Sequence, residues 1–442
     1  METNVTFKNY LGKRLKFQVS FSLQHKLMLQ KHCCKMGEEY YLQCPTKQRF
    51  YYVMAYLMHY FGVCKPQWWE MKAYTNLLAE FSGAIVRIYA PGVLVSLTIF
   101  LFLNYKQLSF DTLGTIFSIW PVAFITNVKV LSTNFKSYQK LIGEFFTKIH
   151  IYNYYKSTKD PFAKMKVLQV ERNTRITGYF IGFILFLDLA LWFVVPIINN
   201  IAHKELIRNK TVRLQTCLYL WAPFDYGYNV NNWIIMHMVS CISTVYGCSS
   251  ITLFDTLNFA FIFNLIGHIE IFKNNIKVRF QKKLNNEEMR FELIETMKYH
   301  AFITQKFKDM ESAFGINIGG NYLQNLFEDS LLLYELMFGP KGDKMQYGLM
   351  IVVYMGELII MSFVLEEIRR QSEDIPEVVY CNIHWEEMSI SNKKIFLPFL
   401  LQVQPIMEFK AACGLRAGVN PMISIFKSTF SYYIMLKSSM KS

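Results

Sequence analysis

Charged side chains are scarce in this sequence. Asp, Glu, Lys and Arg make up 18% of its 442 residues, whereas 52% of the residues are hydrophobic and 16% are aromatic. A water-soluble protein usually carries about 25% charged residues. The charges that are present lie between long apolar runs, which is typical of a protein that crosses a membrane several times. The composition therefore argues against a soluble globular domain and predicts a lipid bilayer around the chain.

Recognisable catalytic motifs are also missing. The sequence has no phosphate-binding glycine loop, no HExxH motif, no nucleophile elbow and no CxxC pair. Its nine cysteines lack paired spacing, which argues against a disulfide framework and against a cysteine zinc site. The excess of Lys and Arg is explained by contact with anionic lipid, so no nucleic-acid partner is expected. We expect a protein that is not an enzyme and needs no cofactor or metal.

Stretches of about 20 mostly apolar residues are long enough to cross a bilayer. Seven such stretches occur, at residues 84–104, 112–131, 176–198, 233–266, 316–338, 347–365 and 420–436. The residues at 286–314 have the apolar spacing of an amphipathic helix. No linker or repeat divides the chain, and no cleavable signal peptide is apparent, so the first span is expected to direct membrane insertion. The fold class is therefore all-α, with residues 1–442 forming a single seven-helix membrane domain.

The loops predict the orientation of these spans. Lys and Arg are concentrated in the N-terminal segment (1–83), between the second and third spans, and after the fourth span. The positive-inside rule then places the N-terminus in the cytosol and the C-terminus outside the cell. This orientation is opposite to that of a G-protein-coupled receptor. It predicts a glycan on Asn209, in the sequence Asn209-Lys210-Thr211, and none on Asn4.

Several ionisable residues fall inside the predicted spans. Lys129 and Asp255 lie toward the cytosolic ends, where a side chain that reaches the membrane interface is the favoured interpretation. Four carboxylates lie nearer the middle of their spans: Asp188, Glu328, Asp329 and Glu357. A carboxylate at this depth costs a few kcal/mol unless it has a partner. It marks either an internal hydrogen-bonded cluster or a functional site, and both alternatives stay open.

Aromatic residues and methionines crowd the outer halves of several spans. They indicate either an interfacial aromatic belt with ordinary packing or an apolar pocket between helices for a small hydrophobic molecule. The candidate pocket residues are Phe117, Trp120, Trp192, Met236, Met350 and Tyr354.

The last span carries a stripe of hydroxyl groups. Asn420 is suited to cap the helix and Pro421 to its first turn. Ser424, Ser428, Ser431 and Met435 recur at i, i+4, i+7 and i+11, so they share one face. Small hydroxyls permit close helix packing, but a hydroxyl stripe that ends in one bulky apolar residue also suits a water-filled pore with a hydrophobic constriction. Its place in the last of seven spans favours the pore, although Lys427 would disfavour cations if it faced the lumen.

The C-terminal region resembles the insect odorant receptor family. The resemblance is carried by Trp385 in YCNIHWEEM, by FLPFLLQVQPIMEFKAACGLRAGVNP, and by FKSTFSYYIML, in which Ser431-Tyr432 match the family's terminal signature. Chain length and the inverted topology agree with it along the rest of the sequence.

The resemblance implies a tetrameric, ligand-gated, non-selective cation channel in the plasma membrane of olfactory neuron dendrites. The terminal helix (420–437) would line the pore, with Met435 at the gate. Residues 267–315 and 366–419 would form a cytosolic anchor between subunits, and a volatile hydrophobic ligand would bind between the second, third, fourth and sixth spans. The chain lacks the long insertion of the family's shared co-receptor. It therefore resembles an odour-tuning subunit that partners the co-receptor; a gustatory receptor channel and a G-protein-coupled receptor are the alternatives.

Overall fold

The computed structural model describes residues 39–64, 69, 77–106, 108, 110–339 and 344–439. Within these ranges every regular element is a helix, and the only extended pairing is an isolated bridge between Lys410 and Arg416. The all-α prediction is confirmed. Residues 1–38, including the Asn4 sequon, lie outside the described residues.

The helices follow one another along the described chain. They are α2 (Arg49–Tyr60), α3 (Leu77–Asn104), α4 (Phe110–Ser132), α5 (Lys136–Glu144), α6 (Ile151–Thr158), α7 (Pro161–Ala202), α8 (Lys204–Arg208), α9 (Val230–Arg279), α10 (Asn286–Phe338), α11 (Lys344–Glu373), α12 (Ile375–Asn382), α13 (Ile390–Gln402) and α14 (Val419–Ser439). Short 3-10 or π turns occur at Pro45–Lys47, Phe145–Ile149, Trp385–Glu387 and Ala412–Gly414.

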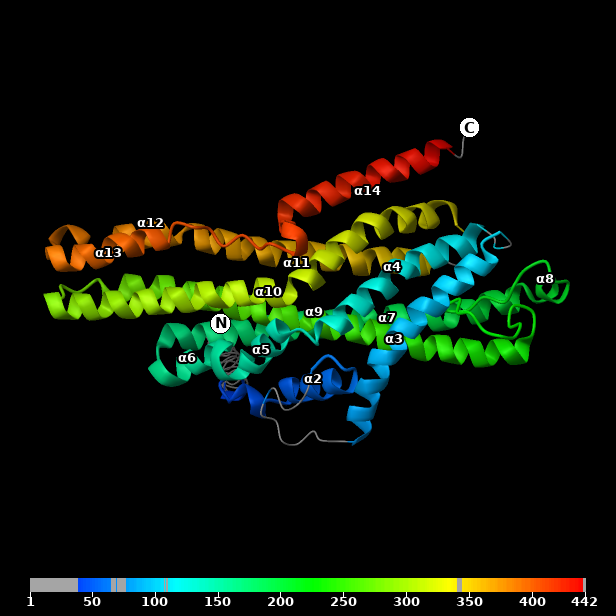
Figure 1. The fold of residues 1–442 in the computed structure, drawn as a ribbon, viewed down its shortest axis with the longest axis horizontal. Coiled ribbons are helices and arrows are strands. Elements are labelled where there is room, and N and C mark those ends of the chain that lie inside the picture. The colour runs from blue at the N-terminus through cyan, green and yellow to red at the C-terminus, as the bar shows by residue number, and fades with distance from the viewer. Residues whose placement is uncertain are drawn as a thin grey trace, which may run out of the picture.

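Three very long helices form the axis of the molecule. α9, α10 and α11 run along its length, and α9 and α10 contain 50 and 53 residues (Figure 1). At 1.5 Å per residue α9 and α10 are each longer than about 70 Å, more than twice the hydrocarbon thickness of a bilayer. The predicted amphipathic stretch 286–314 and the predicted span 316–338 are one unbroken helix, α10, which begins with a capping box between Asn285 and Glu288.

In the part of the chain that the structure describes, five helical segments are long and apolar enough to cross a membrane. They are Glu80–Asn104, Thr112–Ser132, Pro161–Ala202, Val230–Arg279 and Lys344–Asn382. The other two predicted spans lie within α10 and α14, which are more polar. In α10 the polar residues are buried inside the helix bundle, among them Asn317, Asn321, Gln324 and Asn325. Because these residues face protein, this helix needs less apolar character than a span surrounded by lipid.

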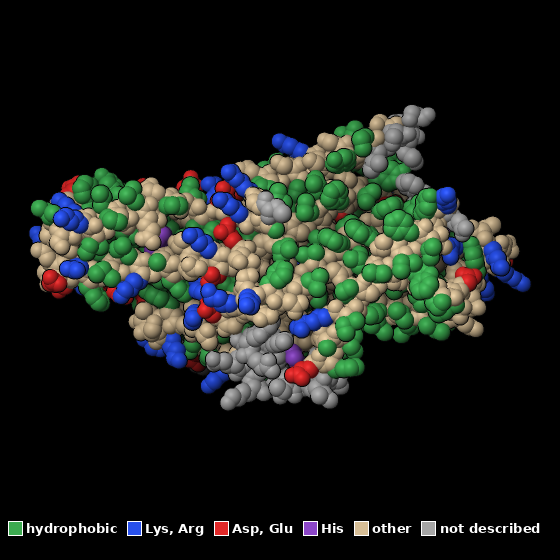
Figure 2. All heavy atoms as spheres, viewed as in Figure 1, with side chains coloured by type: hydrophobic (Ala, Val, Ile, Leu, Met, Phe, Trp, Pro, Cys, Tyr) green, Lys and Arg blue, Asp and Glu red, His purple; other side chains and the backbone are tan. Residues whose placement is uncertain are grey.

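The surface divides along the long axis. Hydrophobic side chains gather over α3, α4 and the α8 end of α7 and α9, whereas charged side chains are denser around α5, α6, α12 and α13 (Figure 2). Large apolar side chains exposed on α3 and α7 include Ile88, Phe102, Leu103, Phe183, Phe186 and Ile201. An exposed apolar band of this kind is expected where lipid covers the surface of the protein.

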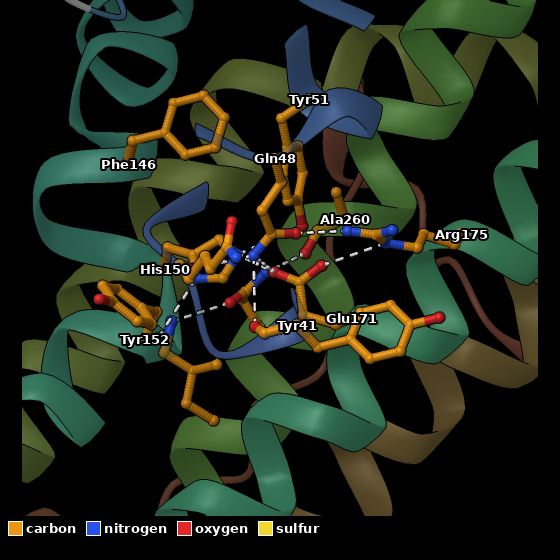
Figure 3. A network of polar contacts seen from close by, with 12 residues as sticks. Tyr41, Gln48, Tyr51, Phe146, His150, Tyr152, Glu171, Arg175 and Ala260 are labelled. Atoms are coloured by element: carbon orange, nitrogen blue, oxygen red, sulfur yellow. Dashed lines mark hydrogen bonds and ion pairs between the residues drawn. The ribbon is translucent and has the colours of Figure 1, made fainter. Parts of the chain in front are cut away.

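A buried polar network fixes the start of α2 against α7 at the charged end (Figure 3). His150 Nδ1 accepts the N–H of Tyr152 at 3.2 Å, so the proton of the neutral ring sits on Nε2, which lies 3.2 Å from Glu171 Oε1. Gln48 donates to the same oxygen at 3.4 Å and accepts a hydrogen bond from Arg175. These partners offset the cost of burying Glu171.

Candidate functional site

An apolar cavity lies among α3, α4, α7, α9 and α11. Its cavity volume is about 80 Å³, and its lining is mostly apolar, as in small-molecule sites. Its lining is Val86, Tyr89, Ala90, Val93, Leu97, Ile119, Val122, Ala123, Thr126, Asn127, Asp188, Trp192, Leu218, Ser243, Thr244, Tyr246, Gly247, Cys248, Met350 and Tyr354. The lining contains no Lys, Arg or His among the described residues.

The α3–α4 hairpin forms one wall of this cavity. Trp120 Nε1 donates to Thr98 Oγ1 at 3.0 Å, and Asn127 Nδ2 donates to the carbonyls of Ala90 and Ala123 at 3.1 and 2.8 Å. The bonds from Trp120 to Thr98 and from Asn127 to Ala90 join α4 to α3, whereas the bond to Ala123 lies within α4. The wall is therefore held in place without a ligand.

The loop between α8 and α9 covers the cavity from the side of α7. Cys217 Sγ donates to the carbonyl of Trp192 at 3.0 Å, and Ser240 Oγ donates to the carbonyl of Leu218 at 2.9 Å. Trp233 Nε1 also donates to the carbonyl of Gln215 at 2.6 Å. The loop is thus tied to α7 and α9, two of the helices that flank the cavity.

Three of the six candidate pocket residues line the cavity: Trp192, Met350 and Tyr354. Met236 is buried in the surrounding apolar cluster without reaching the cavity. Trp120 packs against the same cluster and stacks on Phe124 with ring centroids 5.7 Å apart. Phe117 is 47% exposed, which places it on the outer surface of α4.

Sequence reasoning missed the contribution of α3. Val86, Ala90, Val93 and Leu97 recur at i, i+4, i+7 and i+11, so they form one helical face, and all four line the cavity. This spacing was visible in the sequence. These residues are small or aliphatic, and such a face is also typical of ordinary helix packing or lipid contact, so the spacing alone does not indicate a pocket.

The four mid-span carboxylates have different surroundings. Asp188 is 3% exposed and lines the cavity. Glu328 accepts from Gln324 at 2.8 Å within α10, and Glu357 accepts from Asn321 at 2.9 Å. Asp329 is fully buried, and neither of its carboxylate oxygens has a hydrogen-bond partner among the described residues.

The expectation that Lys129 and Asp255 reach the membrane interface is wrong. Lys129 Nζ on α4 lies 2.6 Å from Asp255 Oδ2 on α9, and both side chains have no exposed surface. Asn321 of α10 donates to Asp255 at 3.3 Å as well as to Glu357 of α11. A charge pair avoids the cost that a lone buried charge would incur. These four residues, the α4–α9–α10–α11 cluster, connect four helices beside the cavity.

The start of α14 is fixed one residue further along α10. Tyr322 accepts the N–H of Gly418 at 3.0 Å and lies 2.6 Å from Ser362 Oγ of α11. Gly418 has φ +147°, a conformation that favours glycine, and α14 begins directly after it at Val419 instead of Asn420.

α14 packs on the rest of the chain through the face that carries Met422, Ile425 and Thr429. Among the candidate pore residues, Ser424, Ser431 and Met435 are exposed and Ser428 is half-buried. Ser424 and Ser431 each hydrogen-bond a carbonyl four residues earlier in the helix. The stripe therefore faces away from the chain's own bundle. In Figure 1, α14 diverges from the other helices toward the C-terminus.

Two cysteines that are 24 positions apart in the sequence meet beside the cavity. Cys217 Sγ of the loop lies 3.5 Å from Cys241 Sγ of α9, and with His237 they offer three ligand atoms within 4.8 Å of one another. A structural zinc site needs four ligands. Among the described residues this group supplies three.

Comparison with known proteins identifies the chain's relatives. The family model described as "7tm Odorant receptor" matches residues 109–430. The solved structure of the insect olfactory receptor OR5 from Machilis hrabei is similar, with a TM-score of 0.71 and 10% identity over 88% of this chain and 97% of that chain. The structure of the same receptor in complex with eugenol has a TM-score of 0.74 and 11% identity over 88% of this chain and 98% of that chain. No curated protein matches. Since the family model covers more than half of the sequence, the chain belongs to the 7tm odorant receptor family.

Proposed function

We propose that this chain is the odour-tuning subunit of a ligand-gated, non-selective cation channel, and that a small, largely hydrophobic volatile binds in the cavity among α3, α4, α7, α9 and α11. The observation that carries the proposal is the cavity itself, because its largely apolar lining suits such a molecule. The similar receptor solved with eugenol supports this class of ligand.

The proposed orientation places the N-terminus and the charged end of the bundle in the cytosol. It rests on the distribution of Lys and Arg. Asn209 is exposed at the end of α8, at the opposite end of the molecule, where an external glycan would be accommodated. The protein would act in the plasma membrane of olfactory neuron dendrites.

The proposed channel is a hetero-oligomer with the odorant co-receptor, and its proposed size is a tetramer. Residues 267–315 and 366–419 would form the cytosolic anchor, and α14 would line the pore through Ser424, Ser428, Ser431 and Met435. The outward orientation of this stripe supports that role, because a pore-lining face must point away from its own subunit.

A continuous set of contacts offers a route from the cavity to α14. α11 contributes Tyr354 to the cavity and, one turn further, Glu357 to the bond with Asn321. The next residue of α10, Tyr322, holds the N–H of Gly418 at the start of α14. A ligand that shifts α11 would thus act on the attachment of α14.

The test is whole-cell current in cells that express this chain with and without the co-receptor, with volatile odorants applied while G-protein signalling is blocked. We expect a fast cation current that needs both chains and survives the block. Current from this chain alone would favour the gustatory-type channel, and a response abolished by the block would overturn the channel assignment.

One tryptophan variant and one phenylalanine variant make the test specific to the cavity. Trp192→Ala removes an aromatic ring from the cavity wall. Contacts with such a ring contribute on the order of 1 kcal/mol or more to binding, so the half-maximal concentration of an active odorant should rise about tenfold or more. Phe117→Ala is the matched control, because this side chain is exposed outside the cavity. Equal effects of the two substitutions would argue against the cavity as the odorant site.

A further inference from the structure

The cavity contains a polar group that packing alone does not explain. Asp188 of α7 lines it and is 3% exposed, and its Oδ1 has no hydrogen-bond partner among the described residues. Asn127 of α4 lines the same cavity and is 7% exposed. Its amide nitrogen is bonded to two carbonyls, while its Oδ1 has no partner among those residues. Two residues that line one apolar space therefore each carry a buried acceptor oxygen without a partner among the described residues.

Several hydroxyl groups of the lining have hydrogen-bond partners within the protein. Thr126 donates to the carbonyl of Val122 at 2.7 Å and Thr244 to that of Ser240 at 2.9 Å. Ser243 donates to the carbonyl of Val239 at 2.6 Å and is also bonded to Tyr89. These groups are engaged along their own helices. The oxygens of Asn127 and Asp188, in contrast, lack a donor and can accept hydrogen bonds from a ligand.

No cation of the protein meets this need at the cavity. Its described lining has no Lys, Arg or His, and the nearby ammonium of Lys129 is held by both carboxylate oxygens of Asp255 at 2.9 and 2.6 Å. A buried carboxylate without a cation or hydrogen-bond donor is costly, and a ligand that supplies either one gains the corresponding affinity.

We propose that the cavity selects small amphiphilic primary amines, whose ammonium group donates hydrogen bonds to Asp188 and Asn127 while the hydrocarbon part packs among Val93, Ile119 and Trp192. An ammonium has three N–H bonds and a positive charge, so it satisfies both acceptors and pairs with the carboxylate. An alcohol has a single O–H and satisfies one acceptor. This inference rests on the proposed odorant cavity and specifies the ligand class for it.

The experiment compares ligands of matched shape. The probes are 2-phenylethylamine, 2-phenylethanol and propylbenzene, with hexylamine, hexanol and heptane as a second set. Current is recorded from cells that express the full chain with the co-receptor. Binding is measured separately as the shift in thermal unfolding of the purified full-length chain in lipid nanodiscs, which does not depend on channel opening.

We expect each amine to act at a concentration about tenfold or more below that of its hydrocarbon counterpart, as a hydrogen bond to a charged group contributes this much. Asp188→Asn should reduce that ratio to about threefold or less while the hydrocarbons keep their potency. Asp188→Ser serves as a second variant if Asp188→Asn does not reach the surface. Glu205→Gln, an exposed carboxylate on α8, controls for loss of charge.

The outcomes separate the two levels of the proposal. Hydrocarbons that match or exceed the amines in the wild-type protein, or an amine preference that both Asp188 variants keep, would overturn the amine inference and leave an odorant channel. Amine binding in nanodiscs without current from any probe would support the inference and count against the channel. Absence of any thermal shift with either amine would overturn the inference regardless of current.

Discussion

Lys129 and Asp255 form a fully buried ion pair between α4 and α9, with Nζ 2.9 and 2.6 Å from the two carboxylate oxygens. Asn258 and Asn321 donate to the same carboxylate at 3.5 and 3.3 Å. The pair is therefore part of a hydrogen-bonded cluster and not an isolated contact. Within a membrane-spanning bundle such a cluster fixes the relative positions of its helices.

Asp255→Asn should strongly destabilise the protein. The substitution leaves the Lys129 ammonium buried without its counter-charge, and removal of one partner of a buried pair typically costs about 3–5 kcal/mol. We expect little protein at the cell surface and a lower unfolding temperature in detergent, measured by surface labelling and by thermal unfolding of the purified chain.

The double variant Lys129→Met/Asp255→Leu is the informative control. It removes both charges and keeps much of the apolar volume, so it should recover a large part of the stability lost in Asp255→Asn. Stability of the double variant at or below that of Asp255→Asn would show that the cluster, and not the unpaired charge, determines the loss.

Tyr322→Phe should loosen the attachment of α14. The substitution removes the hydrogen bond from Gly418 N–H at 3.0 Å and the contact with Ser362 at 2.6 Å, with an expected loss of about 1–2 kcal/mol. If α14 lines the pore, the balance between closed and open states should change, seen as altered basal current or a shifted half-maximal odorant concentration. Tyr380→Phe, at an exposed tyrosine on α12, should leave both unchanged.

His300 provides a pH-dependent stability that is independent of channel activity. It packs between Phe272 and Phe399 with ring centroids 5.5 and 6.1 Å away, and burial lowers its pKa to about 4. The folded state thus binds fewer protons than the unfolded state between the lowered value and the ordinary value of 6.5. Its contribution to stability is complete above pH 6.5 and decreases as the pH falls toward 4.

His300→Phe should therefore flatten the acid side of the stability profile. Relative to wild type, the variant should gain roughly 2 kcal/mol between pH 7.5 and pH 5, measured by thermal unfolding in detergent. His384→Phe, at an exposed histidine, is the control. A parallel decline of the wild-type and His300→Phe profiles would show that other groups dominate acid sensitivity.

The sequence predicted the helical architecture well because apolar run length and periodicity carry that information directly. All seven predicted spans lie within helices, and the amphipathic stretch at 286–314 is helical as well. The sequence did not reveal that α10 is continuous, because Gly315 stands between the amphipathic stretch and the following span, and a glycine at such a point also suits a break between two helices.

Contacts between distant residues were harder to predict. Lys129 and Asp255 are separated by 126 positions, and each alone reads as a residue that reaches the interface. Pairing depends on how α4 and α9 are rotated relative to each other, which spacing within one helix does not specify. The same limit explains why three of six candidate pocket residues miss the cavity, while Asp188, first noted only for its depth, lines it.

Met435→Ala tests the proposed pore face of α14. Met435 is 56% exposed on the single subunit, and it continues the stripe formed by Ser424, Ser428 and Ser431. If this stripe lines the pore, the methionine forms an apolar constriction that keeps water and ions out when the channel is closed. Its removal should increase current without ligand several-fold, recorded in cells that also express the co-receptor.

Ile434→Ala is the matched control, because Ile434 is 62% exposed but lies about 100° around the helix from Met435. The two substitutions remove similar apolar volume, so a leak that appears only in Met435→Ala assigns the constriction to the stripe. If both variants leak equally, α14 faces the pore with a different side, and if neither does, another element closes it. Ion selectivity measured on the same cells adds a second readout, since a wider constriction should admit larger organic cations.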